Sequence, residues 1–332
     1  MRILFAGSPE IALPALRRAA AEHELVGVLT NPDAQKGRGL SAARTPVAQA
    51  AEALGVPVLA PERLGPEARE AAAALGAELL VSFAYGRIFG PKFLALFPRG
   101  GLNVHPSLLP RWRGCAPIPA AILNRDPETG VAVQRLALAM DEGELLGVER
   151  IPLSGRETTE SLSALAAEVG AGLLSRVLRE MAEGRETARH QEGEASYCSM
   201  LRKEDGLLDF GAPALDLDAK ARAFHPWPGA YAFLRGQRLA VLETEPYPGE
   251  AWAGPVPAGA AGPGGAPRPG AILGLDKTRG IMVQTGEGLL ALRRLQLQHK
   301  KALPFREFAN GIRDLAGAEL GTKAEEEAGS RP

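Results

Sequence analysis

The sequence has little cysteine, no long apolar run and almost no net charge. Cys115 and Cys198 lie far apart in unlike surroundings, with no second cysteine near either, so we expect two free thiols and no disulfide. No stretch approaches the roughly 20 apolar residues that a membrane-spanning helix needs. The opening MRILFAGSPE is interrupted too early, by Pro9 and Glu10, to be a secretory signal. These absences predict a cytoplasmic protein without a membrane partner.

Two common motifs are also missing. The turn after the opening strand reads GSPE, not the Gly-x-Gly-x-x-Gly of dinucleotide-binding proteins, which argues against an oxidoreductase. Ser107 lies beside His105 but outside any Gly-x-Ser-x-Gly elbow, which argues against a serine hydrolase. The net charge of −1 excludes no class of partner, because attraction to phosphate depends on where the basic residues cluster.

Short apolar runs alternate with longer helical patterns over the first half of the chain. This order predicts a doubly wound, mostly parallel, Rossmann-like α/β domain. The expected strands are 2–7, 25–30, 78–84, 101–105 and 131–139. The expected helices are 9–22, 45–54, 66–75, 91–97 and 115–124. An apolar stripe over 158–183 predicts a long closing helix.

The second half of the chain predicts a smaller, OB-like β-barrel domain. Its short apolar runs, separated by turn residues, are 230–234, 238–245, 270–275, 280–285 and 288–297. The stretch 248–270 is rich in Gly and Pro and is expected to be a flexible loop. We therefore predict a first domain over 1–184, a linker over 185–203, a second domain over 204–318 and a flexible tail over 319–332.

The stretch GLNVHPSLLPRWRG, residues 101–114, carries candidate catalytic groups. Asn103 and His105 alternate on one face at the carboxyl end of a predicted strand, the edge where open α/β sheets bind ligands. A second predicted strand delivers Asp141, so the three side chains converge if the strands are neighbours. Without a candidate nucleophile, this set suits direct acyl transfer to an amine, since the amide and a protonated imidazole can hold an oxyanion. No metal is expected, because no metal-ligand spacing is present.

These residues resemble the signature of a known family. Asn103-Val-His105-Pro-Ser-Leu-Leu-Pro110, followed by Asp141-x-Gly143, is similar to the motif of the folate-dependent formyltransferases. The resemblance implies that 10-formyltetrahydrofolate is the co-substrate, that Asn103 and His105 polarise its formyl group, and that Asp141 supports the histidine and the proton transfers. The folate contacts that it implies are Ser107, Leu108, Leu109 and Pro110, with Phe83, Tyr85 and Gly86 of FAYGRI, whose backbone would meet the pterin ring.

Further stretches narrow the choice of acceptor amine. The signature alone fits glycinamide ribonucleotide, amino sugars or aminoacyl-tRNA, but a single-domain family member would have only roughly 200 residues. FAGSPEIALPAL, TNPDAQKGRGLSAARTPV, RAFHPWPGAY and LQLQHKKALPFREFANG are similar to the family members that formylate methionyl-initiator tRNA. The resemblance thus implies an enzyme that makes N-formylmethionyl-tRNA, with a catalytic domain over 1–184 and a tRNA-binding barrel over 204–318. We expect a monomer. A formyltransferase for a nucleotide amino sugar, or a formyl-folate hydrolase, is the alternative.

A tRNA stem requires basic residues grouped along a path. In the first domain the candidates are Lys36, Arg38 and Arg44 in a glycine-bearing loop, and Arg111 and Arg113 on either side of Trp112. In the second domain they are Arg293, Arg294, Lys300, Lys301 and Arg306. Arg38 is the residue expected to enter the groove of the acceptor stem. The alternative for each group is a solvated surface, and the alternative for Trp112 is a packing residue. A non-catalytic RNA-binding module is a third hypothesis.

Overall fold

The structure is a computed structural model. It describes residues 1–36 and 41–322, except for the side chains of residues 34–42 and 263. The chain forms two compact units. Unit 1 comprises Met1–Ala121, Pro127–Leu153 and Ser161–Met200. Unit 2 comprises Ile122–Asp126, Ser154–Glu160 and the residues from Leu201 onward. The boundary at Met200 lies beyond the predicted domain end at residue 184, and short pieces of the first half of the chain belong to unit 2.

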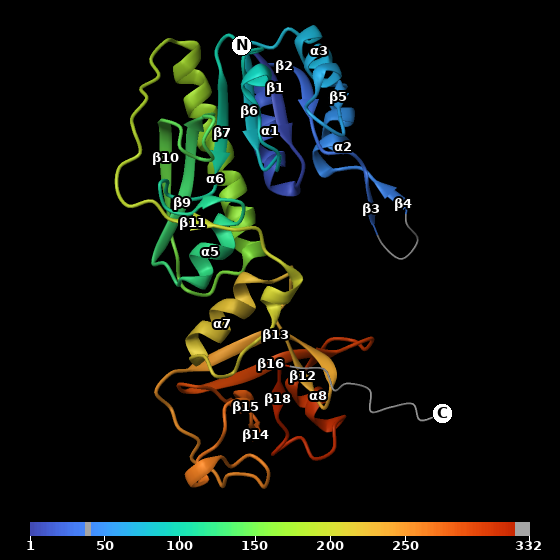
Figure 1. Ribbon diagram of the computed structural model, residues 1–332, viewed down its shortest axis with the longest axis vertical. Helices are drawn as coiled ribbons and strands as arrows, with labels where there is room; N and C mark the ends of the chain where they lie inside the picture. The colour runs from blue at the N-terminus through green and yellow to red at the C-terminus, as the bar shows by residue number, and fades with distance from the viewer. Residues whose placement is uncertain (37–40, 323–332) are drawn as a thin grey trace. The chain divides into compact units, whose positions relative to one another are not determined.

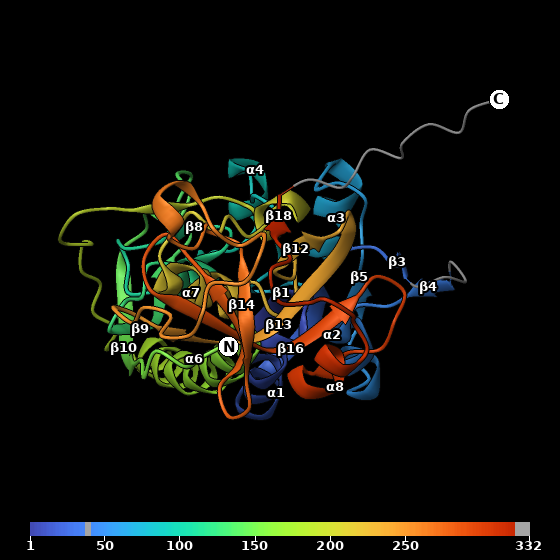
Figure 2. The same cartoon turned by 90° about the horizontal axis from the view of Figure 1, so that it is seen from below.

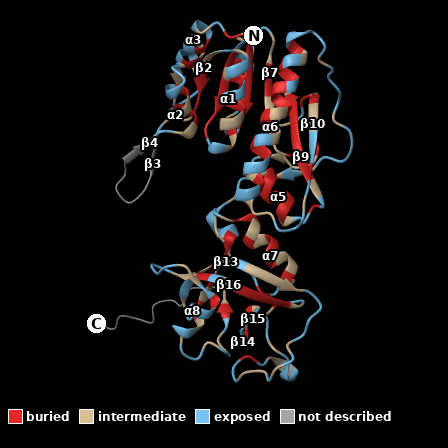
Figure 3. Ribbon diagram, turned by 180° about the vertical axis from the view of Figure 1, so that it is seen from behind, coloured by how far each residue is buried: buried red, intermediate tan, exposed pale blue. Residues whose placement is uncertain are grey.

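Unit 1 contains a seven-stranded sheet in the order β10-β9-β7-β6-β1-β2-β5 (Figure 1). Its strands are β1 (Arg2–Gly7), β2 (Glu24–Leu29), β5 (Val58–Leu59), β6 (Leu79–Phe83), β7 (Gly101–His105), β9 (Glu128–Arg135) and β10 (Leu145–Pro152). The pairs from β5 to β7 are parallel, whereas β9 is antiparallel to both β7 and β10. The predicted Rossmann-like, mostly parallel sheet is confirmed. Buried residues concentrate on these strands (Figure 3), because strands of a parallel sheet are covered on both faces.

The helices of the first half are close to the predicted ranges. They are η1 (Glu10–Ala12), α1 (Leu13–Glu22), α2 (Pro46–Ala53), α3 (Pro66–Ala74), α4 (Pro91–Leu94), α5 (Pro117–Leu123) and α6 (Thr159–Ala182). Proline begins α2, α3 and α4, where its fixed φ suits a first turn and its missing N–H costs no bond. Helix α6 is long and apolar enough to cross a membrane by length and composition alone, but 56% of its most apolar window is buried, as in the core helix of a soluble protein.

The segment predicted as a linker, 185–203, packs against unit 1 over most of its length. Arg189 and Leu145 exchange two backbone hydrogen bonds of 3.0 and 2.8 Å. Further on, β11 (Tyr197–Cys198) pairs in parallel with β8 (Arg113–Gly114). This polar segment is held in place by backbone hydrogen bonds, and such bonds cannot be predicted from the side-chain composition of the segment. A short antiparallel ribbon of β3 (Ala34–Lys36) and β4 (Ser41–Ala43) projects from the sheet of unit 1 (Figure 1).

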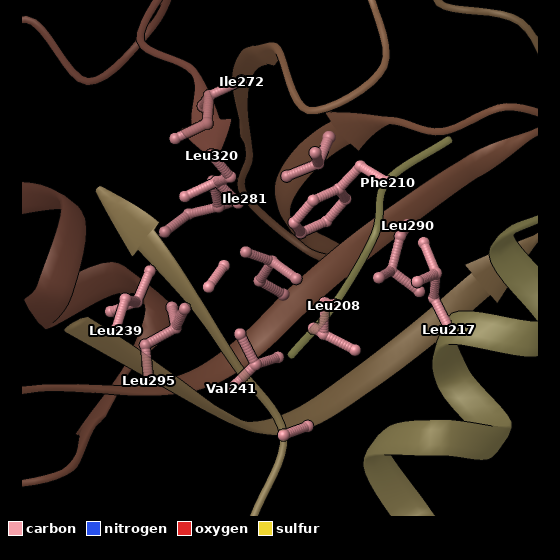
Figure 4. Packing of buried hydrophobic residues seen from close by; sticks show 14 of the residues in the cluster. Leu208, Phe210, Leu217, Leu239, Val241, Ile272, Ile281, Leu290, Leu295 and Leu320 are labelled. Atoms are coloured by element: carbon pink, nitrogen blue, oxygen red, sulfur yellow. The ribbon is translucent and has the colours of Figure 1, made fainter. Parts of the chain in front are cut away.

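Unit 2 is built on an antiparallel sheet in the order β14-β15-β16-β13-β12-β18, with β17 paired to β16. Its strands are β12 (Tyr231–Leu234), β13 (Gln237–Tyr247), β14 (Ile272–Asp276), β15 (Gly280–Gln284), β16 (Leu289–Leu297), β17 (Leu303–Pro304) and β18 (Leu320–Gly321). The other elements are η2 (Lys203–Gly206), α7 (Ala214–Ala223), η3 (Pro263–Gly265) and α8 (Phe305–Asn310). The long strands β13 and β16 run side by side (Figure 2). The core lies between this sheet and α7, where Leu217 packs beside Leu290 (Figure 4).

One expectation for unit 2 needs correction. The predicted tail over 319–332 begins too early, because β18 pairs with β12 and Leu320 is buried; residues 323–332 lie outside the described residues. The Gly- and Pro-rich stretch 248–270 lies in the connection between β13 and β14, as predicted, and it is anchored there, since Ala260 is buried in a small cluster against which Trp252 packs. A few widely spaced apolar residues are sufficient here, because turns bring them together.

Candidate active site

Strand β7 holds two of the candidate catalytic side chains. It lies between β6 and β9, with Asn103 opposite Gln134 and His105 opposite Ala132. His105 is only 4% exposed, and Asn103 is half-buried. The alternation that the sequence predicts therefore places an amide and an imidazole on one face of a strand that is inside the sheet.

Asp141 lies, as predicted, in the turn after the strand, but the path of the chain to that turn differs from the prediction. Strand β9 ends at Arg135, not at residue 139, and runs antiparallel to β7. The loop between β9 and β10 then folds back, closed by a 2.9 Å hydrogen bond from the Arg135 N–H to the Glu144 carbonyl. Asp141 has a φ of 55°, and a Cβ at Gly143 would collide with the Arg135 carbonyl. Glycine at 143 is thus required by the close approach of two backbone segments.

The Asp141 carboxylate is the point where the site converges. Its Oδ1 is 3.2 Å from Asn103 Nδ2 and 3.6 Å from His105 Nδ1. Gln134 Nε2 donates to the same oxygen at 2.8 Å, and the Gly114 N–H donates to Oδ2 at 2.9 Å. The structure therefore brings Asn103, His105 and Asp141 together. Sequence reasoning missed Gln134; the only signal in the sequence was a glutamine within the apolar run of a predicted strand, and its register with Asn103 came from the structure.

Both ring nitrogens of His105 face oxygen atoms. Nε2 is 2.9 Å from the carbonyl oxygen of Trp112, and Nδ1 faces Asp141. Nε2 is within hydrogen-bond distance of the carbonyl, whereas the 3.6 Å between Nδ1 and Asp141 is the distance of an ion pair rather than of a hydrogen bond. An imidazolium at this position would have a carbonyl on one side and a carboxylate on the other.

The RWRG stretch is fixed by its own side chains and by β11. Arg113, 13% exposed, donates through Nε and Nη2 to Gln191 Oε1 at 3.1 and 2.8 Å, and through Nη1 to Glu142 at 3.0 Å. Gly114 has a φ of 113°, and a Cβ there would collide with the Cys198 carbonyl. These contacts make Arg113 part of the frame around Asp141, and its contact with tRNA stays a prediction.

The two cysteines, far apart in the sequence, are neighbours in the structure. The N–H of Cys115 donates to the carbonyl of Cys198 at 3.2 Å, and both thiols are free. Burial raises the pKa of the Cys198 thiol to about 11, while Cys115 is exposed. The pairing of β8 with β11 brings together segments more than 80 residues apart, which no local spacing could reveal.

The predicted folate contacts lie mostly in the interior. Ser107 is fully buried and donates through Oγ to the Arg111 carbonyl at 2.6 Å. Leu109 packs with Ala132 and Leu145, and Pro110 is buried. Leu108 lies half-buried against Gly130 of β9. Any contact of Ser107, Leu109 and Pro110 with a ligand would therefore use backbone atoms.

The aromatic side chains of the FAYGRI stretch, residues 83–88, are also buried. Phe83 and Tyr85 are buried, whereas Gly86 is exposed with a φ of 80°. Asn31 Nδ2 donates to the Tyr85 carbonyl at 2.9 Å. Burial raises the pKa of the Tyr85 hydroxyl, which has no hydrogen-bond partner among the residues that the structure describes. The accessible part of this stretch is thus its backbone around Gly86.

The predicted tRNA contacts fall into different classes. Arg38 lies outside the described residues, as does the side chain of Lys36. Arg44 pairs with Glu52, and the guanidinium carbon of Arg111 is 4.6 Å from the centre of the Trp112 ring. In unit 2, Arg293 pairs with Glu245 and Arg294 with Glu243, and Arg306 donates to the Lys277 carbonyl. Lys300 and Lys301 are exposed and form no ion pair within the described part of the chain.

A metal site does not emerge from the described side chains: no group of three or more His, Cys, Asp and Glu residues among them could hold an ion.

A Rossmann-like sheet presents an amide and an imidazole on β7, and the loop after β9 brings a carboxylate to them. Such a set of groups can stabilise an oxyanion. Comparisons with known proteins give the family. A family model described as formyl transferase matches residues 1–178, and one described as formyl transferase, C-terminal domain, matches residues 200–313. The chain belongs to this formyltransferase family.

Close relatives share the full length of the chain. A methionyl-tRNA formyltransferase of Treponema denticola is 47% identical, over 95% of this chain and 98% of the relative. One from Thermus thermophilus is 41% identical, over 97% of this chain and 99% of the relative. Among solved structures, HypX from Aquifex aeolicus in complex with tetrahydrofolic acid has a TM-score of 0.60 at 17% identity, over 95% of this chain and 48% of that chain. At that identity the likeness shows the fold alone.

Proposed function

We propose that this protein transfers the formyl group of 10-formyltetrahydrofolate to the α-amine of methionyl-initiator tRNA and so makes N-formylmethionyl-tRNA for translation initiation. Full-length relatives named as methionyl-tRNA formyltransferases support this proposal. The single observation that carries the chemistry is the convergence of Asn103 and His105 on the carboxylate of Asp141.

The reaction can proceed by direct attack of the amine. An α-amine titrates at roughly 7.7 to 8.0, so a substantial neutral fraction exists near physiological pH. Its nitrogen forms a bond to the formyl carbon, and the formyl oxygen gains negative charge. The bond from this carbon to the folate nitrogen then breaks, and the proton lost by the amine balances the one that the leaving nitrogen gains. No covalent intermediate with the protein is required.

The three side chains have distinct roles in this scheme. An amide nitrogen carries two donors, and the contact with Asp141 uses one, so Asn103 has a second for the oxyanion. His105, as an imidazolium between Asp141 and Trp112, adds positive charge beside that oxygen. Asp141 orients both partners and can accept the proton released by the amine.

The surrounding residues would hold the substrates. The backbone of 107–110 and of Gly86 is suited to folate, because the neighbouring side chains are buried. Lys300 and Lys301 are the exposed cations of unit 2 best suited to RNA phosphates, within an antiparallel domain that we take to be OB-like. No membrane partner is invoked, and a monomer is sufficient for this chemistry.

The test is formylation of charged initiator tRNA by the purified chain with 10-formyltetrahydrofolate. Asn103→Ala is expected to lower kcat about 100- to 1000-fold, the usual cost of removing one oxyanion donor. Asn310→Ala, an exposed asparagine at the end of α8, is the matched control and should leave kcat unchanged. Formylation of a nucleotide-linked amino sugar, but not of methionyl-tRNA, would contradict the proposal.

A further inference from the structure

Gln191, which the reaction scheme has not used, connects the loop that carries Asp141 with the segment that carries Arg113. It lies after α6, in the segment that composition predicts to be a linker. Its side chain reaches the loop that carries Asp141 and the guanidinium group of Arg113. No motif in the sequence draws attention to this residue, and its role depends entirely on the contacts that the fold creates.

The amide of Gln191 is held at both ends. Its Nε2 donates to the carbonyls of Asp141 and Gly143 at 2.8 and 2.9 Å. Its Oε1 accepts from Nε and Nη2 of Arg113 at 3.1 and 2.8 Å. A flipped amide would set its oxygen against two carbonyls and its nitrogen against a guanidinium, so only one orientation is compatible with these partners.

The carbonyls that Gln191 binds lie at both ends of the Asp141-x-Gly143 turn. This turn depends on a residue with positive φ and on a glycine in close backbone contact. Arg113 contributes a second restraint, because it also binds Glu142 in the middle of the turn. The distances from Asp141 to Asn103 and His105 therefore depend on whether Gln191 holds the backbone of the turn.

We propose that Gln191 is a positioning residue for formyl transfer, which acts through the backbone of Asp141 and is itself oriented by Arg113. It is not a catalytic residue, since its side chain contacts the turn, Gln134 and Arg113 rather than Asn103 or His105. The kinetic part of this inference rests on the proposed function, whereas the structural part can be tested without any assay of activity.

The kinetic test compares Gln191→Ala with the wild-type protein. We expect kcat to fall about 100-fold, as for a displacement of about 1 Å in a catalytic group. KM for 10-formyltetrahydrofolate and for methionyl-tRNA should change less than twofold, because Gln191 contacts neither in this scheme. Glu194→Ala is the matched control on the same exposed segment, and should behave as the wild type. An unchanged kcat in Gln191→Ala would overturn the proposal, as would a rise in KM with kcat preserved.

The structural test is hydrogen–deuterium exchange of the peptide that spans 136–146. Gln191→Ala should speed exchange there at least tenfold and leave β1 and β6 protected, whereas Glu194→Ala should change neither region. Exchange that is unaltered over 136–146 would reject the positioning role even if the protein proves to use another acceptor. If the wild type formylates no tRNA, the proposed function fails while this measurement still decides the inference.

Two more variants guard against a simple failure to fold. Gln191→Glu keeps an oxygen for Arg113 but loses both donors to the turn, so it should match Gln191→Ala in kcat. The double variant Arg113→Ala/Gln191→Ala should lose less kcat than the product of the two single losses, because residues that act as a unit are not additive. Full activity in Gln191→Glu would show that the two carbonyl contacts do not position Asp141.

Discussion

Charged groups in unit 1 and unit 2 are held in different ways. Around Asp141, one carboxylate that is 10% exposed is shared by Asn103, His105, Gln134 and a backbone N–H, and every partner lies outside the loop that carries it. On β16 of unit 2, arginines meet single glutamates of β13 at the surface, as Arg294 meets Glu243. The first arrangement determines the position of backbone and side chains, whereas the second chiefly offsets charge.

This difference predicts how each region responds to change. Exposed ion pairs contribute at most about 1 kcal/mol, since water screens them and both side chains lose freedom. A buried shared network is strongly coupled, so the loss of one member disturbs the others. Single substitutions should therefore have large effects on the reaction near Asp141 and graded effects on RNA affinity in unit 2.

The largest effect is expected for Asp141→Asn, which removes the charge but keeps the shape. The new amide would set a donor against Gln134, His105 or the Gly114 N–H, and proton transfer would lose its acceptor. We expect kcat to fall about 1000-fold, within the usual range for acid–base groups. The control is Asp276→Asn in unit 2. The carboxylate of Asp276 also accepts several hydrogen bonds, and those from the backbone N–H groups of Arg279 and Thr278 lower its pKa to about 2. Equal losses in both variants would remove the distinction between the two regions.

Gly114→Ala should be the next most harmful change. Its φ of 113° disfavours any side chain, and the new Cβ would collide with the Cys198 carbonyl. We expect a loss of about 1–3 kcal/mol in stability, measured as a lowered melting temperature, with a matching fall in activity because the Gly114 N–H holds Asp141. Gly184→Ala is the control, because Gly184 also has a positive φ but a Cβ there would meet no other atom of the residues that the structure describes. The comparison separates the effect of backbone strain from the effect of the collision. A melting temperature equal to that of Gly184→Ala would show that β11 can move away from the new Cβ at little cost in stability.

A smaller effect is expected when cations are removed from unit 2. Lys300→Ala/Lys301→Ala should weaken tRNA binding. It should also lower the slope of log Kd against log salt concentration by about 1–2, because each lysine that contacts a phosphate releases about one counterion. Arg293→Ala/Glu245→Ala removes a matched ion pair and should change that slope little. Binding titrations at several salt concentrations measure both. A larger change in the arginine variant would mean that its pair opens to hold RNA.

The last prediction concerns the chemical reactivity of the two cysteines, where we expect the smallest effect on formyl transfer. Because burial raises the pKa of Cys198 to about 11, its thiol stays protonated and unreactive from pH 7 to 9, whereas the exposed Cys115 is accessible. Iodoacetamide at pH 7.5 should modify Cys115 alone, as peptide mass spectrometry would show. Modification of Cys198 should rise only as the pH approaches 11 or on unfolding. Equal labelling of the two at pH 7.5 would indicate that β8 and β11 separate easily.

Part of the site could be predicted from local sequence. Asn103 and His105 belong to one short strand, and alternation along a strand fixes the face on which both lie. Asp141 was predicted, but its route was not, because antiparallel β9 ends early and a tight turn returns the chain. Gln191 left no signal, since its partners are backbone carbonyls 48 and 50 residues away. The same holds for Cys198, whose neighbour Cys115 comes from another part of the chain.

By itself, the sequence determined the strand and helix periodicity, the two-domain order and the residue types that can stabilise an oxyanion. These properties depend on neighbours a few residues apart, where bond geometry and apolar spacing act directly. Only the tertiary structure decided which carbonyls Gln191 binds, which arginines are neutralised by glutamates, and which predicted ligand side chains are buried. Those outcomes depend on distances between segments far apart in the chain, and such distances are set by packing and backbone pairing rather than by local composition.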